Sequence, residues 1–201
     1  MGVTINQIRL VLELLYFLSG PLIVFIVILG LKQLKTSKDN ARTTAKRESY
    51  SIAAEQCRWY GEKIVPLINR FYEVEEKNNF LFFKKCKVSI NGKNIKIKYP
   101  IMRDNLKNFD KITHELNEVL NHSESFSIFF TSGVADEKVV FHSIASTFCK
   151  TIRYLLPFIM LMRTKDKNDY KPIIDLFLIW NQRLEETSLL DEKEKIESKL
   201  Q

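Results

Sequence analysis

An uncharged apolar segment near the N-terminus constrains this chain more than any other feature. Leu14 to Leu31 covers eighteen residues without a charged side chain. As a helix the segment would be ~27 Å long, which is close to the hydrocarbon thickness of a bilayer. The sequence therefore predicts a transmembrane helix, and we place a membrane anchor at residues 1–34.

A cleaved signal peptide is the alternative interpretation of this segment. Signal peptides carry positive charge before the apolar stretch and a cleavage site of small residues after it. Here Arg9 is the only basic residue before the segment, and no such site follows it. The pattern favours an anchor that is retained in the mature protein.

The charge that follows the segment predicts its orientation. Lys32 to Arg47 contains six basic residues and one acid, Asp39. Because basic residues near the end of a span stay in the cytoplasm, we expect a single-pass inner-membrane protein. Its N-terminus would lie on the outer side of that membrane and its C-terminal domain in the cytoplasm. The chain has three cysteines, Cys57, Cys86 and Cys149. Their spacing is not that of a metal site, which fits reduced thiols in the cytoplasm.

Residues 35–187 are expected to form a cytosolic helical domain. Glycine and proline are scarce, with six and five residues in 201, which favours helices joined by short turns. Apolar residues recur at helical spacing over 50–74, 105–121 and 141–159, and Pro172 suits the first turn of a last helix. The first of these stripes fits either the core face of a bundle or a coiled-coil seam between chains.

Alternating apolar and polar residues interrupt the helical pattern at 85–99. Pairing Ile90 with Ile95, and Val88 with Ile97, through a four-residue loop places the apolar side chains on one face. The sequence therefore predicts a β-hairpin whose opposite face is basic. That face either meets an anionic group or keeps the ribbon soluble and its edge unpaired. Its lysines are Lys85, Lys87, Lys96 and Lys98.

The predicted fold class is mainly α. An N-terminal transmembrane helix is followed by a cytosolic antiparallel helical bundle with one inserted β-hairpin. The charged residues 188–201 are expected to form a solvated C-terminal extension.

No constellation of residues indicates catalysis, metal binding or cofactor binding. His114 and His122 are eight residues apart, which does not place them one above the other on a helix as a metal site needs, and His142 lies beside an apolar stripe. The chain has no glycine-rich phosphate loop, no HExxH and no GxSxG motif. Asp136 and Glu137 suit the first turn of a helix, where carboxylates complement the helix dipole. We therefore expect no enzymatic activity, no metal and no cofactor.

Short motifs spread along the chain carry a family resemblance. They are Ala53 to Cys57, Gly133 to Glu137, Phe141, Phe148-Cys149, Pro157 and Trp180-x-x-Arg183. Together they resemble an uncharacterised family of small bacterial membrane-anchored helical proteins, known only as a domain of unknown function. The resemblance implies an N-terminal span and an all-α cytoplasmic domain over residues 1–187, and it supplies no catalytic residues. The basic hairpin departs from that family's pattern.

These features favour a membrane-tethered interaction or sensing module, in a class that includes stress and phage-defence proteins. Its expected partners are the lipid bilayer with its anionic phospholipid head groups, an unknown protein, and a second copy of the chain. The alternative is a nucleic-acid-binding protein that uses the hairpin and the helix after the anchor, although the lysines come without aromatic residues for base stacking. The predicted contact residues are Lys85, Lys87, Lys96, Lys98, Lys35, Lys38, Arg42, Lys46 and Arg47.

Overall fold

The computed structural model describes residues 5–100 and 108–200. The chain divides into two compact units, residues 1–47 and 48–201. Helix α1 (Ile5–Trp59) begins in the first unit and ends in the second.

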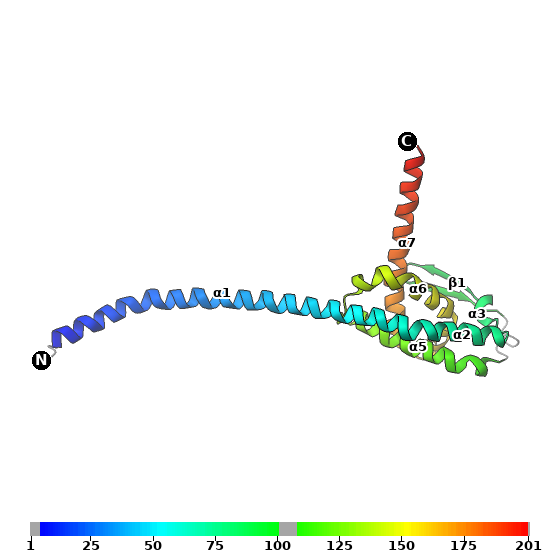
Figure 1. The fold of residues 1–201 in the computed structure, drawn as a ribbon, viewed down its shortest axis with the longest axis horizontal. Helices are drawn as coiled ribbons and strands as arrows, with labels where there is room; N and C mark the ends of the chain where they lie inside the picture. Colours follow the sequence, from blue (N-terminus) through cyan, green and yellow to red (C-terminus); the bar gives the residue numbers. More distant parts are fainter. Residues whose placement is uncertain (1–4, 101–107, 201) are drawn as a thin grey trace. The chain divides into compact units, whose positions relative to one another are not determined.

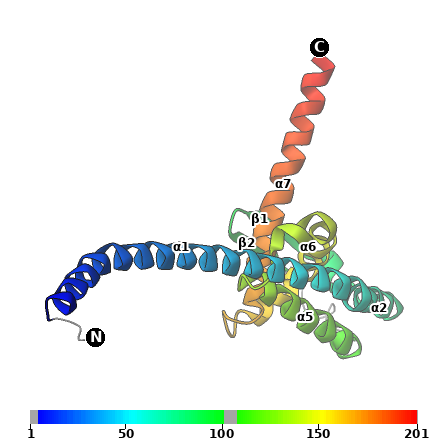
Figure 2. The ribbon, with the colours of Figure 1, turned by 60° about the vertical axis from the view of Figure 1, so that its left-hand side comes forward.

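The described residues of the first unit form the N-terminal part of helix α1, and its apolar side chains are exposed. In the most apolar stretch of this helix no described side chain is buried within the protein. A membrane span and a signal sequence both have this length and composition. Pro21 lies inside α1, and Figure 2 shows the helix curving in its N-terminal part. A bend is expected there because proline removes one backbone hydrogen bond from the helix.

The second unit is mainly helical and, within the described residues, contains one two-stranded antiparallel sheet (Figure 1). The end of α1 continues through a short π-helix into α2, so the helical path runs on to Lys77. The elements after α1 are η1 (Tyr60–Ile64), α2 (Val65–Lys77), α3 (Phe82–Lys85), β1 (Lys87–Asn91), β2 (Asn94–Lys98), α5 (Phe109–Thr131), α6 (Glu137–Met162) and α7 (Lys171–Leu200).

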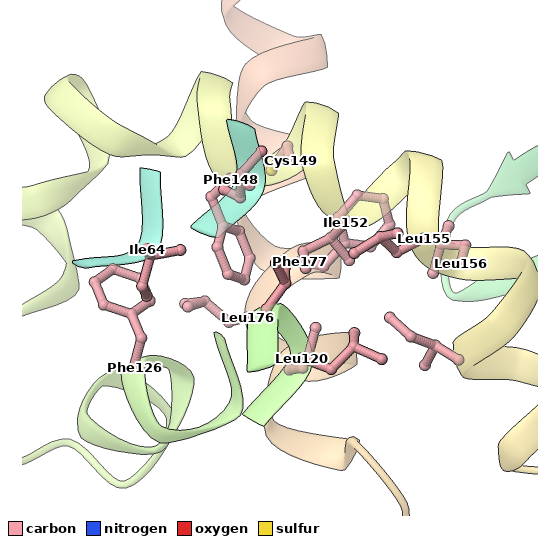
Figure 3. Packing of buried hydrophobic residues seen from close by; sticks show 14 of the residues in the cluster. Ile64, Leu120, Phe126, Phe148, Cys149, Ile152, Leu155, Leu156, Leu176 and Phe177 are labelled. Carbon is pink, nitrogen blue, oxygen red and sulfur yellow. The ribbon is translucent and has the colours of Figure 1, made fainter. Parts of the chain in front are cut away.

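Helices α2, α5 and α6 form the body of this unit, and α7 crosses α5 and α6 (Figures 1 and 2). Helix α5 runs antiparallel to the η1–α2 path. Arg70 of α2 lies 3.3 Å from Glu115 of α5, and Tyr60 of η1 lies against Phe126, with 5.0 Å between ring centroids. Side chains from η1, α5, α6 and α7 meet in one core (Figure 3). The prediction of a mainly α fold with one hairpin is confirmed.

Helix α6 is the element that the spacing of apolar residues predicted most completely. Every residue of its predicted stripe, from Phe141 to Ile159, is buried. By length and composition α6 could also cross a membrane, but most of its apolar stretch is buried, so here it is a core helix. The stripe from residue 50 to 74 also packs into its own chain, which favours the bundle face over the coiled-coil seam. Tyr50 is the error in that stripe. Tyr50 is 40% exposed, and the first buried residue of α1 is Ala53, about one turn later.

Helix α5 extends about ten residues beyond the predicted end near residue 121. Its serine-rich second half looks unfavourable for a helix, because serine competes for backbone hydrogen bonds. In the structure the Ser127 hydroxyl donates to the Ser123 carbonyl inside the helix, at 2.7 Å. The same stretch buries Phe126 and Phe130, so burial of aromatic rings outweighs local propensity. The predicted start near residue 105 lies outside the described residues.

Candidate functional site: the lysine face of the hairpin

Strands β1 and β2 form the predicted antiparallel hairpin. Ile90 pairs with Ile95 and Val88 pairs with Ile97, which is the register that the apolar alternation predicted. These four side chains are half-buried and pack against the core of the second unit. The side chains between them are exposed, so the ribbon has one face on the protein and one face in solvent.

The turn of the hairpin is shorter than the four-residue loop that the sequence predicted. Asn91 and Asn94 also pair across the strands, which leaves Gly92 and Lys93 as the connection. Gly92 has a φ of 57°, in the left-handed region that two-residue hairpin turns require and glycine adopts without strain.

Tyr99 fixes the base of the hairpin to α6. Its hydroxyl donates to the carbonyl oxygen of Pro157 at 3.0 Å, and its ring stacks on Phe82 of α3 with 6.3 Å between centroids. Burial raises the pKa of Tyr99, and the neighbouring Cys86 raises it further. The hydroxyl therefore keeps its proton, and its role as donor, at neutral pH.

Three of the four predicted hairpin lysines share the exposed face. Lys87 lies directly opposite Lys98, and Lys96 lies opposite Ser89. The prediction was wrong for Lys85, which ends helix α3 before β1 begins. The helical turn persists there because the backbone N–H of Cys86 still donates to carbonyls of that turn, at 3.2 Å.

The ribbon carries positive charge without a compensating acid. Residues 86–99 contain Lys87, Lys93, Lys96 and Lys98 and no carboxylate. Like charges directly opposite on paired strands repel each other. An anion placed over this face would relieve the repulsion, as expected from Coulomb's law.

The other predicted contact residues lie on α1 in the first unit, and all are exposed. Their spacing of three and four residues places most of them along one side of the helix. These residues are Lys35, Lys38, Arg42, Lys46 and Arg47.

A polar centre that the sequence did not predict joins α6 to α7. The Glu137 carboxylate accepts two hydrogen bonds from Arg183, at 2.9 and 2.8 Å, and one from the Trp180 indole at 2.9 Å. The guanidinium also lies 4.8 Å from the centroid of the Phe141 ring. Burial raises the pKa of Glu137, but the hydrogen bonds from Arg183 and Trp180 and the charge of Arg183 hold it below its ordinary value. Glu137 therefore ties two helices together, while the neighbouring Asp136 caps α6 by accepting from the backbone N–H of residue 138.

A buried carboxylate also lies between α2 and α6. Glu75 is 2% exposed and accepts a hydrogen bond from the Tyr154 hydroxyl. The ring of Tyr72 packs edge-on against Tyr154, with 5.5 Å between centroids. Burial raises the pKa of Glu75, and the bond from Tyr154 and the charge of Lys84 offset only part of that effect.

The histidines and cysteines form no site in the part of the chain that the structure describes. No group of three or more histidine, cysteine or carboxylate side chains there is placed to hold a metal ion. His122 stacks on Trp59 with 5.6 Å between centroids. The cysteines are free, and burial raises the pKa of Cys149 to about 12.

Comparison with known proteins identifies a family for this chain but gives no activity. A family model described as a domain of unknown function (DUF4760) matches residues 22–177. The matched range includes the basic part of α1, the hairpin, and the helices up to the start of α7. No curated protein and no solved structure matches the chain.

Proposed function

The chain belongs to the DUF4760 family of unknown function, and we propose that it is a membrane-tethered interaction module. Helix α1 anchors it in the inner membrane, and the helical unit works on the cytoplasmic side. The exposed apolar stretch of α1 and the six basic residues from Lys32 to Arg47 support this orientation, because positive charge is retained in the cytoplasm.

The lysine face of the hairpin is the observation that carries the proposed activity. Lys87, Lys96 and Lys98 point away from the core on a ribbon without a carboxylate. Near an anionic leaflet each basic residue contributes about 1 kcal/mol of attraction. Three such lysines supply about 3 kcal/mol, which is enough to bring this face of the unit onto anionic phospholipid head groups.

The same lysines have a simpler explanation and a competing ligand. Lysine on an exposed strand keeps a ribbon soluble and prevents edge-to-edge pairing. Nucleic acid is the other polyanion, but the remaining exposed hairpin residues are serine, asparagine and glycine, and single-strand binding sites need aromatic platforms. Confinement of the unit near a membrane favours the lipid. A sensing role in stress or phage defence would use the same contact.

The test is co-sedimentation of the second unit, residues 48–201, with lipid vesicles. Binding is expected on vesicles with anionic phospholipid and not on neutral vesicles. It should disappear at 1 M salt, where the Debye length falls to about 3 Å. Circular dichroism melting of the same fragment shows whether it is folded.

Two variants with equal changes in net charge distinguish binding through the hairpin lysines from attraction by the overall positive charge of the unit. Replacing Lys87, Lys96 and Lys98 with glutamine should abolish binding. Replacing the exposed Lys111, Lys138 and Lys167 with glutamine should leave most of it. If both variants bind equally well, the hairpin lysines serve only to keep the ribbon soluble. If the fragment prefers DNA to anionic vesicles, the nucleic-acid alternative is supported.

A further inference from the structure

The C-terminal part of α7 carries an apolar face that none of the described residues covers. We call residues 186–200 the α7 extension. Every described side chain from Glu186 to Ser198 is exposed. Leu189 is 66% exposed and Ile196 is 54% exposed. Figures 1 and 2 both show this end of the helix, in red, running on beyond the core of its unit.

Two of the exposed apolar residues are spaced for helix pairing. Leu189 and Ile196 are seven residues apart, which places them on one side of the helix two turns apart. Seven-residue spacing is the repeat of a coiled coil. Within the extension, Lys193 and Glu197 form an ion pair of 3.7 Å one turn apart. Such exposed pairs contribute little, and a helix of this length is marginal in water without packing, so a partner on the apolar side would stabilise it.

The two halves of the extension differ in charge. Residues 186–192 contain the acids Glu186, Asp191 and Glu192 and no basic residue. Residues 193–200 contain three lysines and two glutamates. Parallel pairing of two extensions would place the acidic halves against each other, whereas antiparallel pairing places each acidic half against a basic one. Charges that flank an apolar seam select orientation in this way.

We propose that the α7 extension pairs with the α7 extension of a second copy of the chain, in antiparallel orientation. Leu189 then packs against the partner's Ile196, and Glu192 lies opposite the partner's Lys193. The same contacts occur twice, as the two-fold symmetry of an isologous dimer requires. This interface goes beyond the proposed lipid contact and uses a different surface. An anionic membrane or a nucleic acid is disfavoured as occupant, because the extension contains five carboxylates and three lysines.

The test is thiol crosslinking of the full chain in membranes of expressing cells. A short bis-maleimide should join two copies of the Lys193→Cys variant, since residue 193 lies at the centre of the pair. Asp191→Cys is the matched control. It is two residues away on the opposite side of the helix and should give no more dimer than the parent chain, which reports any reaction of the native cysteines.

Orientation is decided by two further variants with different tags. Residues 189 of two antiparallel helices are about 10 Å apart along the axis, so Leu189→Cys alone should crosslink poorly. Leu189→Cys expressed together with Ile196→Cys should crosslink several times better. Leu189→Glu with Ile196→Glu should remove the Lys193→Cys dimer without changing the melting temperature, because both positions are exposed. Absence of the Lys193→Cys dimer, equal reaction at Asp191→Cys, or a strong dimer of Leu189→Cys alone would each overturn the proposal.

Discussion

At the scale of single residues, the Glu137–Arg183 pair should contribute measurably to the stability of the helical unit. Replacing Arg183 with glutamine removes both bonds from the guanidinium and leaves Glu137 with the Trp180 indole. The Arg183 side chain is 34% exposed, so solvent screens part of the effect. We predict a loss of about 1–2 kcal/mol, below the value for a fully buried pair. Urea denaturation of residues 48–201 measures it.

A double-mutant cycle checks that this loss comes from the pair. Glu137→Gln and Arg183→Gln should be less damaging together than the sum of their separate effects. The effect should also depend on pH. The folded pKa of Glu137 is held below its ordinary value by its partners, so its stabilising effect is present above the unfolded value of 4.5. It is lost as the pH falls through the folded pKa. Strict additivity at neutral pH would contradict the pairing.

Glu75 should behave in the opposite direction. Burial raises its folded pKa, so its ionisation costs stability as the pH rises above the ordinary carboxyl range. Glu75→Gln removes that charge and keeps an oxygen to accept the hydrogen bond from Tyr154. We predict a melting temperature above the parent's at pH 8, with the difference shrinking toward pH 4. A lower melting temperature for the variant at pH 8 would show that Glu75 is stabilised as an anion.

At the scale of elements, packing between α6 and α7 should dominate the stability of the unit. Phe148 is 1% exposed and Trp180 is fully buried, and their ring centroids are 5.2 Å apart. Either alanine variant should lose about 3–5 kcal/mol, a large part of the 5–15 kcal/mol typical of a domain. Val139→Ala, on the exposed side of α6, is the matched control and should cost under about 0.5 kcal/mol. Thermal melts of residues 48–201 that hardly distinguish these variants would show that the core lies elsewhere.

Elements with strong patterns were predictable from sequence, and elements set by tertiary packing were not. The stripe of α6 and the register of the hairpin follow from side-chain periods of 3.6 and 2. The end of α5 does not, because Phe126 and Phe130 hold a serine-rich stretch helical through contacts with distant residues. Lys85 was misplaced for a similar reason, since buried Phe82 and Phe83 extend a helical turn into the expected strand.

The candidate site shows the same division. Alternation of residues predicted the shared face of Lys87, Lys96 and Lys98 correctly. The bonds of Glu137 to Trp180 and Arg183 join residues more than forty positions apart, and no local pattern specifies that meeting. A signal was present, because Trp180 and Arg183 are one turn apart on a helix and Glu137 is an acid at the start of another. Their pairing follows from the way α7 crosses α6.

At the scale of the whole molecule, one helix carries both the apolar and the basic segments. Helix α1 runs from Ile5 to Trp59, so the basic residues after the apolar stretch are helical. A cleaved signal sequence would remove the apolar stretch, whereas an anchor would keep it attached to the helical unit. The two possibilities predict different mature proteins, and the orientation predicts which side of the membrane that unit occupies.

We predict that the chain keeps its N-terminus and places its C-terminus in the cytoplasm. An epitope tag before Met1 should remain on the mature protein in the membrane fraction, and a fluorescent protein fused after Gln201 should fluoresce. An alkaline phosphatase fused at the same point should be inactive, because that enzyme needs the oxidising periplasm. The physical cause is the six basic residues from Lys32 to Arg47, which resist export. Changing Lys32, Lys35, Lys38 and Arg42 to glutamine should therefore raise phosphatase activity. Loss of the N-terminal tag would identify a signal sequence. An active phosphatase on the unchanged chain would reverse the orientation, and the cytoplasmic leaflet could then not be the surface proposed for the hairpin.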